Sequence, residues 1–112
     1  MHELGITQNI VAIVSDAANG RRVRRVTLEV GELSGVMTDA IVFCFDVVAQ
    51  DTLLEGAELN IRVIRGRARC GDCGAEFATP KLYTPCVCGS RQLEQLQGDE
   101  LNIKTMELEE AA

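Results

Sequence analysis

Residues 26–31 read VTLEVG, and this stretch decides the fold. Its apolar residues alternate with Thr27 and Glu29, which is the two-residue period of a strand that buries one face. Gly31 closes the stretch. A second alternating segment, LNIRV, follows at residues 59–63. The sequence therefore predicts two strands within the first two thirds of the chain.

Two helices are expected around these strands. Residues 6–19 carry apolar side chains at spacings of three and four and end before Gly20, a suitable helix stop. Thr38 is a plausible N-cap for a second helix over residues 39–50, which is apolar on more than one face. The order strand, helix, strand predicts a crossover unit with neighbouring parallel strands.

A last strand is predicted over residues 101–108, after a turn at Gly98. Its apolar alternation slips between Ile103 and Met106, as at a β-bulge or in a strand buried on both faces. Together these elements predict an α/β fold with a small mixed three-stranded sheet and two helices.

Residues 66 to about 92 differ in composition from the rest, since Gly, Cys, Pro and polar residues dominate. Such a segment cannot build its own hydrophobic core and needs a metal ion to fold. We expect two domains: an α/β domain of residues 1–66 and 93–112, and a zinc-binding, zinc-ribbon-like domain of residues 67–92 inserted in it.

Composition limits the classes of function. The 112 residues are 46% hydrophobic and 25% charged, with a formal net charge of -6, as in an ordinary soluble globular protein. The acidity argues against a nucleic-acid partner, whose phosphates call for Lys and Arg. No apolar run approaches the ~18 residues that span a bilayer, and no secretory signal opens the chain. We expect a cytoplasmic protein that binds neither membrane nor nucleic acid.

Four of the five cysteines form two close pairs. Cys70 and Cys73 form a C-x-x-C pair, Cys86 and Cys88 form a C-x-C pair, and twelve residues separate the pairs. Two pairs on either side of a short hairpin can deliver four thiolates to one tetrahedral Zn²⁺. Such a site has no open position and is structural. The alternative is a redox dithiol. The fifth, Cys44, is expected to be a buried helix residue.

The single histidine is at position 2. A histidine there is ordinarily a solvated terminal residue. The position also permits a chelate: the Met1 α-amine, the His2 backbone nitrogen and imidazole, and the Glu3 backbone nitrogen can form a square of four nitrogens. Square-planar nitrogen coordination suits Ni²⁺ or Cu²⁺.

Eight arginines fall into two clusters. They either line solvated strand edges near acidic neighbours or form a docking face for an acidic partner. The clusters are Arg21, Arg22, Arg24 and Arg25, and Arg62, Arg65, Arg67 and Arg69.

Features along essentially the whole chain resemble the HypA/HybF family of nickel metallochaperones. The match combines a Met-His-Glu start with a four-cysteine insert, which is more specific than either alone. The matching segments are Met1-His2-Glu3, residues 26–36 (VTLEVGELSGV), 43–46 (FCFD), 55–57 (EGA), 88–90 (CGS) and 98–101 (GDEL).

The resemblance implies a nickel site on His2 with the Met1 amine and the backbone of His2 and Glu3, and a structural zinc ion. It places the zinc ligands at Cys70, Cys73, Cys86 and Cys88. The family works with the GTPase HypB and delivers nickel to the large subunit of [NiFe]-hydrogenase, and some members also serve urease. One departure is the second cysteine pair, which is usually C-x-x-C in the family.

The sequence thus predicts a non-enzymatic nickel metallochaperone for hydrogenase maturation, a monomer or weak homodimer. One histidine at the terminus leaves no catalytic triad, and the chain has no phosphate-binding loop. Two alternatives remain: a zinc-ribbon adaptor that binds protein or nucleic acid through its arginines, with His2 incidental, and a redox sensor that uses its cysteines.

Overall fold

The computed structural model describes residues 2–110. They form two compact units. The first holds the described residues up to Leu28, Val36–Arg62 and those from Asn102 on, and the second holds Glu29–Gly35 and Val63–Leu101. The chain passes between the units three times within a strand and once in a loop, so neither unit is one continuous segment.

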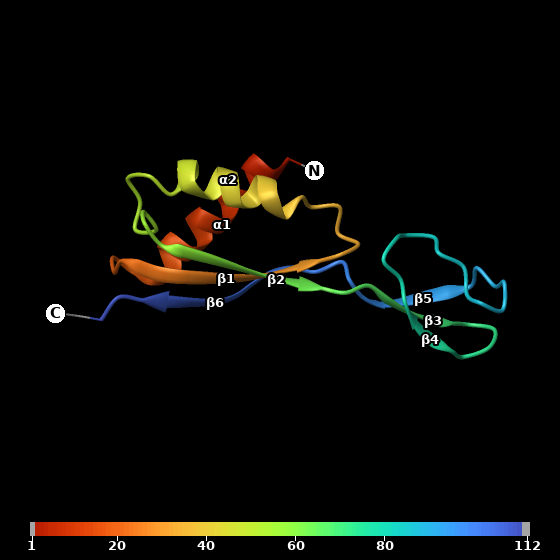
Figure 1. Cartoon of the computed structure of the whole chain (residues 1–112). Helices are drawn as coiled ribbons and strands as arrows, with labels where there is room; N and C mark the ends of the chain where they lie inside the picture. Colours follow the sequence, from red (N-terminus) through yellow and green to blue (C-terminus); the bar gives the residue numbers. More distant parts are fainter. Residues whose placement is uncertain (1, 111–112) are drawn as a thin grey trace. The chain divides into compact units, whose positions relative to one another are not determined.

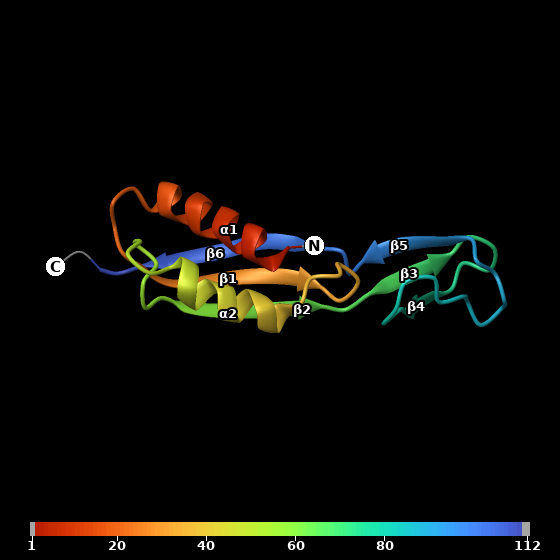
Figure 2. The same ribbon diagram turned by 90° about the horizontal axis from the view of Figure 1, so that it is seen from above.

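A mixed three-stranded sheet in the order β2-β1-β6 carries the two helices on one face (Figures 1 and 2). The arrows of β1 and β2 point the same way and that of β6 points the opposite way, which confirms the predicted crossover unit. The Glu109 N–H donates to the Arg22 carbonyl at 2.9 Å where β6 ends beside the start of β1. The elements are α1 (Glu3–Ala18), β1 (Val23–Gly31), α2 (Thr38–Val48), β2 (Glu58–Ile64) and β6 (Leu101–Leu108).

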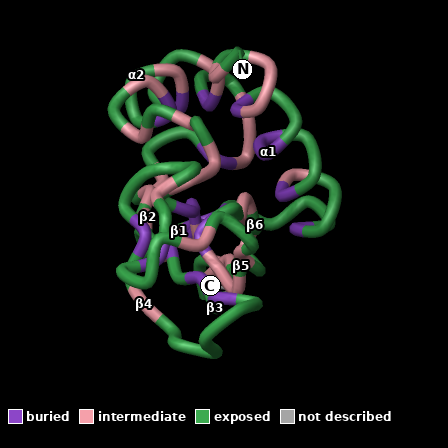
Figure 3. The backbone as a smooth tube through the Cα atoms, turned by 90° about the vertical axis from the view of Figure 1, so that its right-hand side faces the viewer, coloured by how far each residue is buried: buried purple, intermediate pink, exposed green. Residues whose placement is uncertain are grey.

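The main core lies between the helices and the central strand. Val26, Leu28 and Val30 of β1 are at most 1% exposed, as the alternation in residues 26–31 predicts. Thr27, expected on the open face, is 6% exposed, so β1 is buried on both faces at this position. Val14 of α1 and Phe45 of α2 are buried as well, and Figure 3 marks such buried residues along both helices and β1. Full burial of an aliphatic or aromatic side chain stabilises the fold by about 1.5–3 kcal/mol, so these contacts hold the helices on the sheet.

Both helices begin one to three residues earlier than the periodicity predicts. His2 is the extended N-cap of α1, so the helix starts at Glu3 instead of residue 6. Met37, not Thr38, is the N-cap of α2, so that part of the prediction is wrong. Asn19 ends α1 in the left-handed conformation at φ 52°. Within the described residues neither helix is long and apolar enough to cross a membrane.

The second unit contains an antiparallel sheet in the order β4-β3-β5. Ala68 of β3 pairs with Phe77 of β4 on one side and with Gln95 of β5 on the other. Two of its strands, β3 and β4, lie in the segment that the composition separates from the rest of the chain, and β5 lies just after it. The strands are β3 (Arg67–Cys70), β4 (Glu76–Ala78) and β5 (Leu93–Gln97).

Two glycines let backbone segments of the second unit approach closely. Gly98 has φ 119°, and a Cβ atom built on it would lie 2.6 Å from the Gly66 Cα. A Cβ on Gly66 would overlap the Thr79 carbonyl oxygen. The Leu33 N–H donates to the Gly98 carbonyl at 2.6 Å. Only glycine fits at these two positions.

Candidate metal sites

The four paired cysteines meet in a single cluster in the second unit. Cys70 ends β3, Cys73 lies in the turn after it, and the other pair lies in the loop before β5. The sulfur atoms of Cys70 and Cys88 are 3.7 Å apart, those of Cys73 and Cys86 are 3.6 Å apart, and all four lie within 4.8 Å of one another.

These separations fit a metal ion and exclude disulfides. A tetrahedral ion with metal–sulfur bonds of 2.3 Å places its sulfurs about 3.8 Å apart, whereas a disulfide joins two sulfurs at about 2.05 Å. All five cysteines are free thiols. The cluster is therefore a four-thiol metal site in its geometry.

Backbone amides in the turn from Cys70 to Cys73 face the Cys70 sulfur. The N–H groups of Cys73 and Asp72 each donate to the Cys70 Sγ at 3.4 Å. The Cys73 N–H is the largest cause lowering the pKa of the Cys70 thiol to about 6, because a hydrogen bond to sulfur stabilises the thiolate. Gly74 at φ 77° closes this turn with its N–H on the Cys70 carbonyl. The turn thus favours the charged form that binds metal.

In the rest of the cluster, thiol pKa values are raised instead of lowered. The Ser90 N–H favours the Cys88 thiolate, but its sulfur neighbours Cys86 and Cys70 outweigh that bond and raise the pKa of Cys88 to about 12. The pKa of Cys73 is also raised, although the Ala75 N–H lowers it, because Cys86 and Cys70 crowd the thiol. Four thiolates this close repel one another, so full ionisation requires a cation among them.

The short C-x-C spacing still brings both its sulfurs into the cluster. Val87, between them, is fully exposed, while Cys86 is buried. Ser90 donates through its hydroxyl to the Asp72 carboxylate, which ties the loop after the second pair to the turn of the first.

The N-terminal candidate residues lie in the first unit. Met1 falls outside the described residues. His2 is exposed, its side chain caps no helical amide, and its carbonyl accepts the Ile6 N–H at 3.1 Å. The Glu3 N–H is the first in α1, and the first four N–H groups of a helix have no intrahelical partner. A metal ion could therefore take the Glu3 nitrogen without breaking a helical hydrogen bond.

The Glu3 side chain is engaged elsewhere. Its carboxylate accepts the Met37 N–H at 3.1 Å, and this hydrogen bond is the largest cause lowering the pKa of Glu3. The Thr7 hydroxyl donates to the Glu3 carbonyl at 2.7 Å. Sequence reasoning named Glu3 for its backbone nitrogen and missed this contact, since 34 residues separate the partners.

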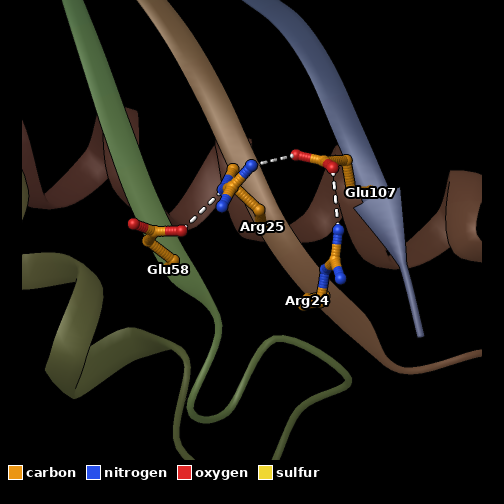
Figure 4. A network of polar contacts seen from close by, with 4 residues as sticks. All are labelled: Arg24, Arg25, Glu58 and Glu107. Atoms are coloured by element: carbon orange, nitrogen blue, oxygen red, sulfur yellow. Dashed lines mark hydrogen bonds and ion pairs between the residues drawn. The ribbon is translucent and has the colours of Figure 1, made fainter.

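Arginines of both clusters are paired with acidic neighbours, as the strand-edge interpretation predicts. Figure 4 shows Arg25 of β1 between Glu58 of β2, at 2.6 Å, and Glu107 of β6, at 2.8 Å. Arg24 contacts the other oxygen of Glu107 at 3.0 Å. In the second unit Arg69 lies 3.4 Å from both Glu76 and Glu94. Three of the eight clustered arginines are thus paired with carboxylates.

The fifth cysteine differs from the prediction. Cys44 of α2 is half-buried, not buried, because its neighbour Phe45 faces the core and is 3% exposed. It takes no part in the metal cluster.

Comparisons with known proteins show the family to which the chain is related. A family model described as hydrogenase/urease nickel incorporation, metallochaperone, hypA matches residues 1–108. The hydrogenase maturation factor HypA of Trichormus variabilis is 58% identical over 110 residues, covering 98% of this chain and 97% of the relative. That of Rippkaea orientalis is 59% identical over 111 residues, with the same coverage.

A solved structure shares the fold. The solution structure of the nickel metallochaperone HypA from Helicobacter pylori matches with a TM-score of 0.66 at 24% identity, covering 96% of this chain and 97% of that one. Together with the family match, this likeness identifies the resemblance seen in the sequence as true membership. The chain belongs to the HypA family of metallochaperones for nickel incorporation into hydrogenase and urease, and is a maturation factor, not an enzyme.

Proposed function

We propose that this chain binds Ni²⁺ at its N-terminus and delivers it during maturation of [NiFe]-hydrogenase in the cytoplasm. One observation carries the proposal: His2 is an exposed N-cap, and the Glu3 amide after it is the first of α1. The Met1 amine, the His2 backbone and imidazole nitrogens and the Glu3 nitrogen then form a four-nitrogen square, which suits Ni²⁺.

Such a site favours transfer. The His2 and Glu3 nitrogens lie at the N-terminal end of α1, where His2 is exposed, so a receiving site can replace the ligand nitrogens one at a time. The amine and imidazole must give up their protons to bind a metal ion. Nickel affinity therefore falls as the solution becomes more acidic.

The four-cysteine cluster serves a different purpose in this proposal. Cys70, Cys73, Cys86 and Cys88 hold a Zn²⁺ ion, for which four thiolates are a closed, structural ligand set. A closed set offers no position for substrate or water. The zinc ion would supply the folding energy that residues 67–92 cannot draw from a hydrophobic core of their own.

The partners follow from family membership. The chain would receive or pass nickel in concert with the GTPase HypB and donate it to the large subunit of the hydrogenase. As the acting form we propose a monomer or weak homodimer. The relatives named above are hydrogenase maturation factors, and this supports the hydrogenase as recipient.

Calorimetric titration of Ni²⁺ tests the N-terminal site. The variants are His2→Ala and a chain with two extra residues before Met1, with Gln8→Ala on the exposed side of α1 as a matched control. Both changes should abolish tight binding, since one removes the imidazole and the other the free amine in register. Unaltered nickel binding by the extended chain would contradict the chelate and favour an adaptor role. Failure to release nickel to a competing apo-protein would contradict a carrier.

A further inference from the structure

A cavity of about 380 Å³ lies in the second unit, away from the four sulfurs. Its floor includes Ala68 of β3 and Leu93 of β5, and its wall is the loop from Lys81 to Thr84. Figure 1 shows the segment between β4 and β5 (cyan) rising away from the strands before it returns into β5. Leu33, from the loop after β1, completes the lining, and all of the lining residues belong to the same compact unit.

The charge of the lining is opposite to that of the chain. Lys81 and Arg91 line the cavity, and no carboxylate does. In the part of the chain that the structure describes, no ion pair joins either cation to an acidic residue. A protein of net charge -6 therefore keeps two uncompensated cations around one hollow. The complementary ligand is an anion.

A buried hydroxyl also lines the cavity without a partner. Thr79 is 4% exposed, and its Oγ1 has no hydrogen-bond partner among the described residues. Its backbone is satisfied, because the Thr79 N–H donates to the Gly66 carbonyl at 2.8 Å. A buried polar atom without a partner destabilises a protein, so its presence in a cavity wall points to a ligand that completes it.

The cavity lies beside an edge strand, since Leu93 and Gln95 of β5 line it. A second recess of about 90 Å³ shares Tyr83, Thr84, Arg91 and Leu93 with the cavity and adds Pro85. Within the described residues β5 lies at the edge of the β4-β3-β5 sheet. An edge strand offers unpaired backbone N–H and C=O groups to a further strand. A free strand edge suits an extended chain better than a compact anion.

We propose that the cavity and the recess beside it, together called the groove, bind an extended acidic peptide segment of another protein. The peptide backbone pairs with β5, an acidic side chain lies between Lys81 and Arg91, and an alternate apolar side chain packs on Leu82 and Leu93. Recognition rests on charge and backbone, so many acidic sequences bind. The proposal requires neither nickel nor the N-terminal chelate.

Amide chemical shifts of the uniformly ¹⁵N-labelled, metal-loaded chain test the proposal. The probe is a seven-residue peptide of alternating valine and glutamate, titrated to about 1 mM, the weak end of specific binding. Shifts should concentrate at residues 79–84 and 91–95. The same peptide with glutamine for glutamate should bind at least tenfold more weakly. A version with proline for the central valines, which lacks the N–H groups for strand pairing, should not bind.

Variants distinguish binding in this groove from nonspecific attraction between opposite charges. Arg91→Gln and Lys81→Gln should each weaken binding by about tenfold, as the loss of a charge-assisted hydrogen bond predicts. Lys104→Gln on β6 is the matched control and should change nothing. Thr79→Val should raise the thermal midpoint of the free protein while weakening the peptide complex, a pair of effects that a purely structural threonine would not give.

Several outcomes would overturn the proposal. One is the absence of shifts at residues 79–95 across the titration. Another is equal binding of the glutamine peptide, which would make the groove a general apolar surface. Equal shifts with inorganic phosphate alone would make it a simple anion site. Concentration-dependent shifts without peptide would assign the groove to a second copy of this chain.

Discussion

The Glu3 carboxylate accepts a hydrogen bond from the Met37 backbone N–H at 3.1 Å. Met37 is the N-cap of α2, and its amide is the one that a glutamate three residues into the same helix satisfies in a capping box. Ala40 occupies that position in α2 and has no acceptor. Glu3 therefore supplies from α1 the acceptor that α2 lacks, and fixes the start of one helix to the start of the other.

Replacing Glu3 with alanine should loosen the first turn of both helices. Hydrogen exchange of the Met37 amide should accelerate and the thermal midpoint should fall, because the amide loses its acceptor. Glu3→Gln keeps an uncharged acceptor, so its Met37 exchange rate and its thermal midpoint should lie between those of Glu3→Ala and wild type. Gln8→Ala, an exposed change on the same helix, is the control. Unchanged exchange at Met37 in Glu3→Ala would show that the contact contributes nothing.

Glu107 should make stability depend on pH. Arg24 first, and then Arg25, hold the pKa of Glu107 below its ordinary value of 4.5. A lowered folded-state pKa means that the stabilisation is fully present above pH 4.5 and is lost as the pH falls through the folded value. Thermal midpoints of wild type and Glu107→Gln should therefore differ most at neutral pH and converge in acid.

Glu110→Gln controls for the loss of a carboxylate without these partners. A difference between wild type and Glu107→Gln that stayed constant into acid would mean that the arginines do not act through the charge of Glu107.

Removing the metal should unfold one sheet and spare the other. Cys70→Ser removes the thiol with the lowered pKa and should abolish metal binding, with loss of amide dispersion across β3, β4 and β5. Cys44→Ser is the matched control, because Cys44 lies on α2 outside the cluster, and it should retain the full metal content. Metal analysis and amide spectra measure both. Intact strands in metal-free Cys70→Ser would refute a folding role for the metal.

A methyl group on Gly98 should destabilise the fold strongly. The new Cβ would lie 2.6 Å from the Gly66 Cα, at a φ of 119° that side chains rarely adopt. The expected cost is about 3 kcal/mol in the free energy of unfolding. Gly35→Ala has φ 77° but open space around the added atom, so it should cost only about 1 kcal/mol. Denaturant unfolding measures both, and equal costs would show that the approach of Gly66 to Gly98 is not tight.

Sequence patterns predicted the elements that bury one face. The alternation of Val26, Leu28 and Val30 indicated the central strand, and the structure buries all three. The cysteine spacing indicated the four-sulfur cluster despite its C-x-C half. Both signals are local, since each depends on residues a few positions apart that must share a face or a ligand.

Features that depend on distant segments escaped the sequence. The bond from Met37 to Glu3 joins residues 34 apart, and nothing local marks it. Lys81 and Arg91 meet at one groove only because a loop returns beside β5. Cys44 and Phe45 both belong to an apolar helix, and only the packing decides that Phe45 faces the core. Tertiary contacts determine such details, and periodicity does not encode them.

The strand order β2-β1-β6 has a consequence for how the chain folds. Between β2 and β6 the chain runs through the whole β4-β3-β5 sheet, so β6 reaches β1 only across a long detour. Pairing between segments far apart in sequence is slow. Metal binding by the cysteines shortens that detour by holding its middle together. Metal supply should therefore set the rate at which the helix-covered sheet gains its third strand, although no ligand of the cluster belongs to that sheet.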